Sequence, residues 1–201
     1  MAAAKKQDEA ARRLEPGDWE RAALDAIAAG GVASVSIPRL AEQLGVTKGS
    51  FYWHFDGLDS LLAAALARWE AAYTDRRIAR FETELSSPTE RLKPWSAEAE
   101  ADHQAQALYL EISNAAATRP AFAAVVSRVV EKRVAFLART YRELGVTAKA
   151  ARRRAVTAYA GYVGMLHLAR IAPTTVGSAA ERVATVREAV RLLRGTPSER
   201  T

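Results

Sequence analysis

The stretch SIPRLAEQLGVTKGSFYWHF at residues 36–55 decides the fold of this 201-residue chain. Ser36 and Thr47 are each expected to cap a short helix, because their side-chain oxygens can accept hydrogen bonds from the free N–H groups of a first turn. Gly45 permits the backbone conformation of a sharp turn between the two helices. Ala41, four residues before this glycine, has the small side chain needed where the second helix crosses closely over the first. The spacing predicts a helix-turn-helix, whose second helix enters the major groove of DNA.

Polar and aromatic side chains share this second helix. A helix buried in a core would not carry a lysine, a tyrosine, a tryptophan and a histidine within seven residues. Tyr52 and His54 can each donate a hydrogen bond to a phosphate oxygen, and Lys48 can reach a base edge or a phosphate. The predicted DNA contacts are Ser36, Arg39, Thr47, Lys48, Gly49, Tyr52, Trp53 and His54. The alternative is a helical hairpin that serves only for packing.

Helical patterns continue on both sides of this stretch. Apolar spacing predicts a helix over 19–29 that is capped by Gly17 or Asp18 and stopped by the glycines at 30–31. Asp56, with Asp59 three residues later, is expected to start another helix.

The rest of the chain is helical as well. Residues 87–90 and 178–181 have the spacing of capping boxes, and a boundary is expected at Pro120. Thr147 is expected to cap a long helix to about residue 172, whereas 94–104 indicates a loop or a frayed helix. Because no segment alternates with period two, the fold is expected to be all-α. The expected divisions are a mobile N-terminal arm at 1–15, a helix-turn-helix DNA-binding domain at 16–57, a helical effector-binding and dimerisation domain at 58–196, and a tail at 197–201.

Composition excludes several classes of protein. With 49% hydrophobic and 26% charged residues, the chain is not intrinsically disordered. The absence of cysteine excludes disulfides, thiolate zinc sites and iron–sulfur clusters, and it fits a cytoplasmic protein. The longest nearly apolar run, 158–169, is shorter than the roughly 20 residues that span a bilayer, and the N-terminus lacks the apolar region of a secretory signal.

Charge is unevenly distributed along the chain. The net charge is +6, which suggests an anionic partner. Residues 1–60, however, hold seven Lys and Arg against nine Asp and Glu, whereas residues 61–201 carry a net charge of +8. The DNA-binding prediction therefore rests on the helix-turn-helix and not on bulk charge.

The chain resembles the TetR-type (tetracycline-repressor) family of transcription regulators over about residues 18–66. The matching residues are Gly30, Gly31, Ser36, Leu40, Ala41, Gly45, Val46, Thr47, Tyr52, His54, Phe55, Leu61 and Leu62. The resemblance implies a three-helix DNA-binding head, a fourth helix that links it to a larger domain binding a small molecule, and a dimer interface made by the last two helices. Pro38 and Leu58 stand where the family often has Arg and Lys, which implies greater reliance on the cations of the N-terminal arm, namely Lys5, Lys6, Arg12 and Arg13.

Two further sets of residues follow from the larger domain. Small residues at 158, 161 and 164, and a 3-4-3 apolar seam on the last helix, predict a four-helix dimer interface. Its expected members are Tyr159, Tyr162, Val163, Leu166, Val183, Val186, Val190 and Leu193, and the alternative is packing within one chain. Candidate effector contacts are Trp69, Tyr73, Trp95, His103, Tyr109, Asn114 and Met165, and the alternative for each is an ordinary core or surface residue.

The expected function is that of a one-component transcription regulator, a repressor released from a palindromic operator by a small-molecule effector. Its expected partners are double-stranded DNA, a second copy of the chain and an unidentified effector, with no cofactor, no metal and no membrane. An enzyme is disfavoured, because the three histidines are far apart and neither a glycine-rich phosphate loop nor a G-x-S-x-G motif is present. A helical ligand-binding or scaffold protein without DNA binding remains the alternative.

Overall fold

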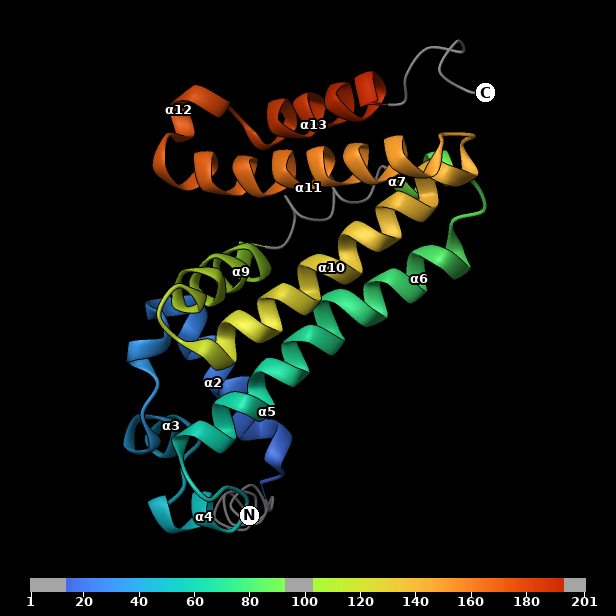
Figure 1. Ribbon diagram of the computed structural model, residues 1–201. Helices are drawn as coiled ribbons and strands as arrows, with labels where there is room; N and C mark the ends of the chain where they lie inside the picture. The colour runs from blue at the N-terminus through green and yellow to red at the C-terminus, as the bar shows by residue number, and fades with distance from the viewer. Residues whose placement is uncertain (1–13, 93–102, 194–201) are drawn as a thin grey trace, which may run out of the picture.

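The computed structural model describes residues 14–92 and 103–193, and these residues form helices, turns and loops without a β-strand. The expected all-α fold is confirmed. In Figure 1 the short helices lie at the lower end and two long helices, α11 and α13, lie across the top. A long helix and α10 run diagonally between these two ends. No helix in the described ranges is both long and apolar enough to cross a membrane.

The lower end, called the head here, is built from short helices around one aromatic contact. They are α2 (Pro16–Gly30), the 3-10 turn η1 (Val32–Ser34), α3 (Ile37–Gln43) and α4 (Lys48–Tyr52). Trp19 of α2 and Phe51 of α4 are fully buried, and their rings meet edge to face with centroids 5.3 Å apart. Leu40 and Ala41 of α3 are buried beside them. The helix-turn-helix is therefore held by the apolar residues that its spacing predicts.

Two helices, α2 and the one that follows α4, begin differently from the prediction. The N-cap of α2 is Glu15, and Asp18 lies inside the first turn, where its carboxylate accepts a hydrogen bond from the Glu15 N–H at 2.8 Å. The next helix, α5 (Leu58–Glu70), is capped by Gly57 and not by Asp56. There the Gly57 N–H donates to Ser60 Oγ at 3.2 Å, so serine takes the role assigned to Asp59.

A single long helix leads from the head into the upper part, called the body here. It comprises α5, a π-helical turn η2 (Ala71–Asp75) and α6 (Arg76–Glu84). After α7 (Pro88–Leu92), the body continues with α9 (His103–Ala116), α10 (Pro120–Glu143), α11 (Ala148–Ile171), α12 (Pro173–Val176) and α13 (Ala179–Leu193). The capping boxes at Ser87 and Ser178 and the boundary at Pro120 are confirmed. The short α12 has no counterpart in the sequence prediction, and most of the predicted 94–104 loop lies outside the described residues.

The core of the head continues into the body. One cluster of buried side chains extends from Trp19 in α2 to Leu166 in α11 and includes Leu108 and Ile112 of α9. A second cluster surrounds Phe81 of α6 and the apolar face of α10. Because the first cluster has members in both parts, a shift of α9 or α11 would change the packing beneath α3 and α4.

Two glycines with positive φ allow a contrast in stability. Gly31 (φ 72°) ends α2, and a Cβ there would lie 3.0 Å from Glu111 Oε2. Gly45 (φ 69°) forms the turn of the helix-turn-helix, and no atom lies within 4 Å of its Cβ position. We expect Gly45→Ala to cost about 1–2 kcal/mol of unfolding free energy for backbone strain alone, and Gly31→Ala to cost more. Urea unfolding monitored by circular dichroism checks the order, and equal midpoints would contradict it.

Candidate nucleic-acid interface

The short helix α4 lies at the lower extremity of the molecule (Figure 1). Phe51 faces inward with 0% exposure, whereas Tyr52 is 62% and Trp53 is 86% exposed. The Tyr52 ring rests edge-on against Phe51, with centroids 5.2 Å apart. One buried aromatic residue thus fixes the helix while the next two side chains project into solvent.

The eight predicted DNA contacts lie on α3, on α4 or beside these helices. Lys48 and Gly49 are exposed together with Arg39 of α3, and His54 is half-buried. Ser36 and Thr47 occupy the predicted N-cap positions with extended backbones, but neither side chain makes a capping hydrogen bond. The predicted side-chain caps are therefore wrong.

The two positions that depart from the family pattern carry no cation. Pro38 is exposed in the first turn of α3, and Leu58 is half-buried and packs against the core cluster of the head. Exposed Arg39 is the neighbouring cation on α3. The four cations of the predicted arm lie outside the described residues.

A polar aromatic cluster occupies the interior of the body. The hydroxyls of Tyr109 (α9) and Tyr159 (α11) share a hydrogen bond of 2.9 Å, and the Tyr109 ring lies 6.3 Å from that of Trp69. Arg133 of α10 is 3% exposed and lies over the Tyr109 ring at 5.4 Å. Its guanidinium donates to Thr74 Oγ1 at 3.2 Å and to the Tyr73 carbonyl at 3.1 Å.

The cluster unites three of the predicted effector residues. Trp69, Tyr73 and Tyr109 lie together in the first core cluster. Burial raises the pKa of the neighbouring Tyr159 phenol, which therefore stays neutral. The predicted contacts His103 and Asn114 are exposed on α9, and His103 lines a groove where the head meets the body.

Other members of that prediction have different outcomes. Met165 is half-buried on α11, and Trp95 lies outside the described residues. Arg133 was missed, although a cation within the buried stripe of α10, between Val129 and Leu137, is a recognisable pattern.

The predicted dimer residues divide between core and surface. Tyr159 and Leu166 are buried within one chain, so they are not available on its outer face. On α13, Val190 and Leu193 pack against the second core cluster, while Val183 and Val186 are half-buried. Val190 and Leu193 thus have contacts within their own chain, and the dimer interface stays a prediction. The large apolar side chains that remain exposed on α11 and α13 are Val156, Leu168, Ile171 and Leu192.

A groove of about 690 Å³ lies where the head meets the body. The end of α2, including Gly30, forms one wall, and residues of α9, α11 and α13 form the others. Arg170 pairs with Glu111 across this groove at 2.7 Å. On the neighbouring surface, the Gln104 amide donates to the Asp25 carboxylate at 2.5 Å. The Gln104–Asp25 contact joins α2 to α9, and the Arg170–Glu111 pair joins α11 to α9, beside the shared core.

An ion-pair network ties the connecting helix to α10 at the π-helical turn. Glu70, 7% exposed, lies 2.8 Å from Arg128 and 3.0 Å from Lys132, which also pairs with Asp75 at 2.7 Å. The Arg128 guanidinium, with Lys132, holds the pKa of the Glu70 carboxyl below its ordinary value, against the opposing effect of burial. The network fixes the register of the long helix along α10.

This network predicts a pH dependence of stability. A carboxyl whose pKa is lower in the folded state stabilises the protein above its ordinary pKa, near 4.5, and that contribution is lost as the pH falls through the folded value. We expect Glu70→Gln to be less stable than the wild type at pH 7, with the difference shrinking below about pH 4.5. Urea unfolding at pH 7, 5 and 3.5 measures it, and a difference that grows on acidification would contradict the assignment.

The described residues contain no group of three or more His, Cys, Asp or Glu side chains placed to hold a metal ion.

The sequence of the head is similar to known regulatory proteins, and the fold of most of the chain is similar to solved structures. The family model described as bacterial regulatory proteins, tetR family, matches residues 21–65. The chain is 44% identical over 46 residues to the HTH-type transcriptional regulator SrpR of Pseudomonas putida, a match that covers 23% of this chain and 22% of that protein. The chain thus spans about a fifth of the length of this curated relative.

Solved structures extend the likeness in fold to the body. A regulator from Saccharomonospora viridis, solved in complex with choline, has a TM-score of 0.75 at 19% identity and covers 88% of this chain and 95% of its own. FadR from Bacillus subtilis, solved with stearoyl-CoA, has a TM-score of 0.67 at 15% identity. The match covers 90% of this chain and 98% of the FadR chain. The described chain therefore has the arrangement of head and body found in these regulators.

Proposed function

Because residues 21–65 match the family model described as bacterial regulatory proteins, tetR family, we propose that the chain is a DNA-binding transcription regulator of this family. In this proposal residues 16–57 bind DNA, and residues 58–196 bind an effector and form a homodimer. The protein acts in the cytoplasm, where its DNA is, and catalyses no reaction. It represses from a palindromic operator and is released by a small molecule.

The observation that carries the proposal is the exposure of α4. Tyr52, the last residue of α4, and Trp53, which follows it, are more than half exposed, whereas Phe51 of α4 is fully buried against Trp19 of α2. A packing hairpin would cover these rings, because leaving large apolar side chains in water forgoes the free energy of their burial. Lys48 and Arg39 add exposed cations on either side of the turn, as phosphate contacts require.

The effector is proposed to bind in the body beside the cluster of Tyr109, Tyr159 and Arg133. Similar proteins were solved with choline and with stearoyl-CoA, which supports a ligand but does not identify this one. A ligand that separates α9 from α11 changes the core shared with the head, since Leu108 and Leu166 belong to it. DNA affinity then falls by the factor by which the ligand prefers the arrangement with α9 and α11 separated over the arrangement that binds DNA.

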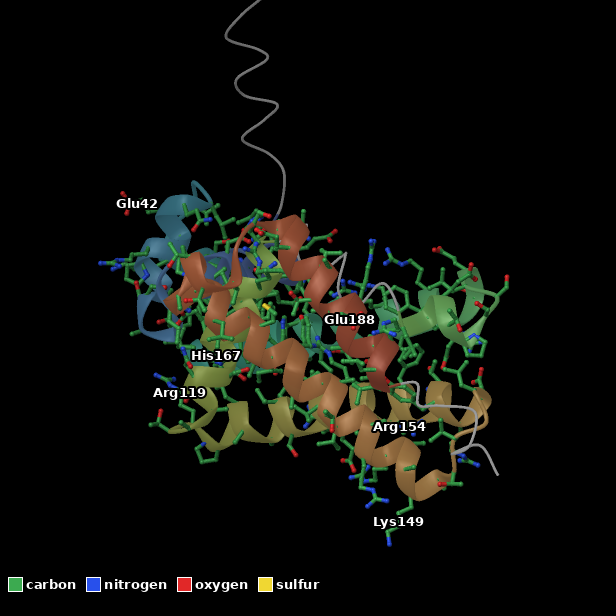
Figure 2. All side chains as sticks on the ribbon, turned by 90° about the horizontal axis from the view of Figure 1, so that it is seen from above. Glu42, Arg119, Lys149, Arg154, His167 and Glu188 are labelled. Atoms are coloured by element: carbon green, nitrogen blue, oxygen red, sulfur yellow. The ribbon has the colours of Figure 1, made fainter. Side chains whose placement is uncertain are left out.

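The homodimer is proposed to form through the outer face of α11 and α13. Figure 2 shows these helices side by side, with His167 and Glu188 marking them. No atom lies within 4 Å of a Cβ built on Gly161 or Gly164, so nothing in the same chain explains their small size. The exposed Ile171 and Leu168 lie farther along this face of α11, which a second copy would cover.

Selection of bound sequences from a random DNA pool with the full chain tests the function. We expect an enriched sequence with two-fold symmetry, bound with an affinity that falls as salt is raised. Failure to enrich any sequence, with binding of a small molecule retained, would favour the alternative of a ligand-binding scaffold protein without DNA binding. The absence of cations at Pro38 and Leu58 fits that alternative.

Paired variants test the docking of α4 on the selected DNA. Tyr52→Phe removes one hydroxyl and should weaken binding evenly across sequences, whereas Lys48→Ala should also change sequence preference. Glu84→Gln on α6, an exposed change in the body, is the matched control and should leave binding unchanged. If Tyr52→Phe and His54→Ala both keep full affinity, the docking is wrong.

A further inference from the structure

We propose that Trp53 determines sequence specificity, and that its indole recognises thymine through the C5 methyl group in the major groove. The inference rests on the proposed function, because it names what the exposed end of α4 contacts on DNA. Four observations on this helix carry it.

Trp53 has the largest exposed fraction among the large hydrophobic side chains that the structure describes. At 86% it exceeds Ile171 at 74%, and it adjoins Tyr52 at 62%. The two side chains are neighbours in the sequence, and both expose most of their surface at the end of the head. A surface of this kind marks a contact with another molecule.

The backbone that carries this indole is held on both sides of Trp53. Phe51 and Phe55 are buried, with ring centroids 5.5 Å apart. The backbone N–H groups of His54 and Phe55 donate to the Phe51 carbonyl at 2.9 and 3.0 Å, so Trp53 lies inside a closed turn. Its Cα cannot retreat without breaking this turn, and the side chain is therefore presented in advance of binding.

The face that carries the indole allows a close approach to a groove. Gly49, Tyr52 and Trp53 are three and four residues apart, which places them on one side of the helix. Gly49 is exposed, and the nearest atom to a Cβ built there is Thr47 Oγ1 at 3.6 Å. Without a side chain at this position, the rings can reach the base edges before the backbone meets the phosphates.

The chemistry of the indole selects the base. An indole has one hydrogen-bond donor, no acceptor and an apolar carbon rim. The thymine methyl is the apolar group on the base edges of the major groove, where guanine, adenine and cytosine present polar atoms. An indole laid against a polar edge would desolvate it without replacing its hydrogen bonds, so thymine is the favoured contact.

Removal of single methyl groups tests the contact. Thymines in the selected operator are replaced one at a time by deoxyuridine, which lacks only the methyl, and dissociation constants are measured by fluorescence anisotropy at one salt concentration. At one position in each half-site, uracil should weaken wild-type binding about three- to fivefold, the effect of one buried methyl. The same replacement should leave Trp53→Ala unaffected and should still weaken Tyr52→Phe, which is the matched control.

The other outcomes overturn the proposal separately from the function. If Trp53→Ala loses the same factor on thymine and uracil probes, the indole contacts phosphate or sugar and not the methyl. An operator without a thymine fixed in each half-site also overturns it, although DNA binding would stand. Trp53→Phe keeps an apolar ring, so it replaces Trp53→Ala in the comparison of thymine and uracil probes if the alanine variant binds too weakly to measure. Only the absence of any selected sequence would remove the proposed function as well.

Discussion

Phe51→Ala is expected to lower the free energy of unfolding by about 3–5 kcal/mol, the usual cost of removing a large buried side chain. The ring is fully buried and contacts Trp19 edge to face at 5.3 Å. It also stacks on Phe55 at 5.5 Å and supports Tyr52 from beneath. One substitution thus leaves a cavity under the whole of α4. Thermal and urea unfolding followed by circular dichroism measure the loss.

The same variant should lose operator binding more completely than the change in global stability requires. Five helical residues, Lys48–Tyr52, cannot hold a helix in water without packing, so α4 should melt even while the body stays folded. Phe51→Leu, which fills most of the space, is the matched control and should retain most of both properties. Hydrogen exchange would show the loss of protection confined to the head. Wild-type affinity in a folded Phe51→Ala protein would contradict the role assigned to this ring.

Local patterns predicted the DNA-binding helices well because their geometry depends on few residues. Gly45 adopts the positive φ that a sharp turn requires, and Ala41 and Phe51 are buried at the crossing. The starts of α2 and α5 were predicted less well. There Glu15 and Gly57 hold the cap positions while Asp18 and Ser60 accept their N–H groups from the first turn. A side chain at either end of a capping box can be mistaken for the cap, since each contacts the other's backbone.

The body was predicted less well, because periodicity shows which face of a helix is apolar but not what covers it. Val190 and Leu193 have the spacing of an intermolecular seam, yet they pack within their own chain. Tyr159 finds its hydrogen-bond partner, Tyr109, fifty residues away on another helix. Contacts of this range depend on how α9, α10 and α11 cross, which no local pattern in the sequence specifies.

Ile171→Asp is expected to convert the proposed dimer to a monomer. Ile171 is 74% exposed at the end of α11, and in a two-fold interface each copy would bury its own carboxylate. A buried charge without a partner costs about 3–5 kcal/mol, and this cost is incurred twice. Dimer affinity should therefore fall by about ten-thousandfold or more. Analytical ultracentrifugation across a range of concentrations measures it.

Operator binding should fall with the dimer, because a monomer contacts one half-site where the dimer contacts two. The affinity of Ile171→Asp for a single half-site should remain that of the wild type, since α4 lies at the opposite end of the molecule (Figure 1). Ala124→Asp, an equally charged change on the exposed side of α10, is the matched control and should leave the dimer intact. A wild-type sedimentation coefficient for Ile171→Asp would place the dimer interface elsewhere on the body. Loss of half-site binding together with an intact dimer would instead mean that the substitution acts through the fold, by way of the shared core that joins α11 to the head.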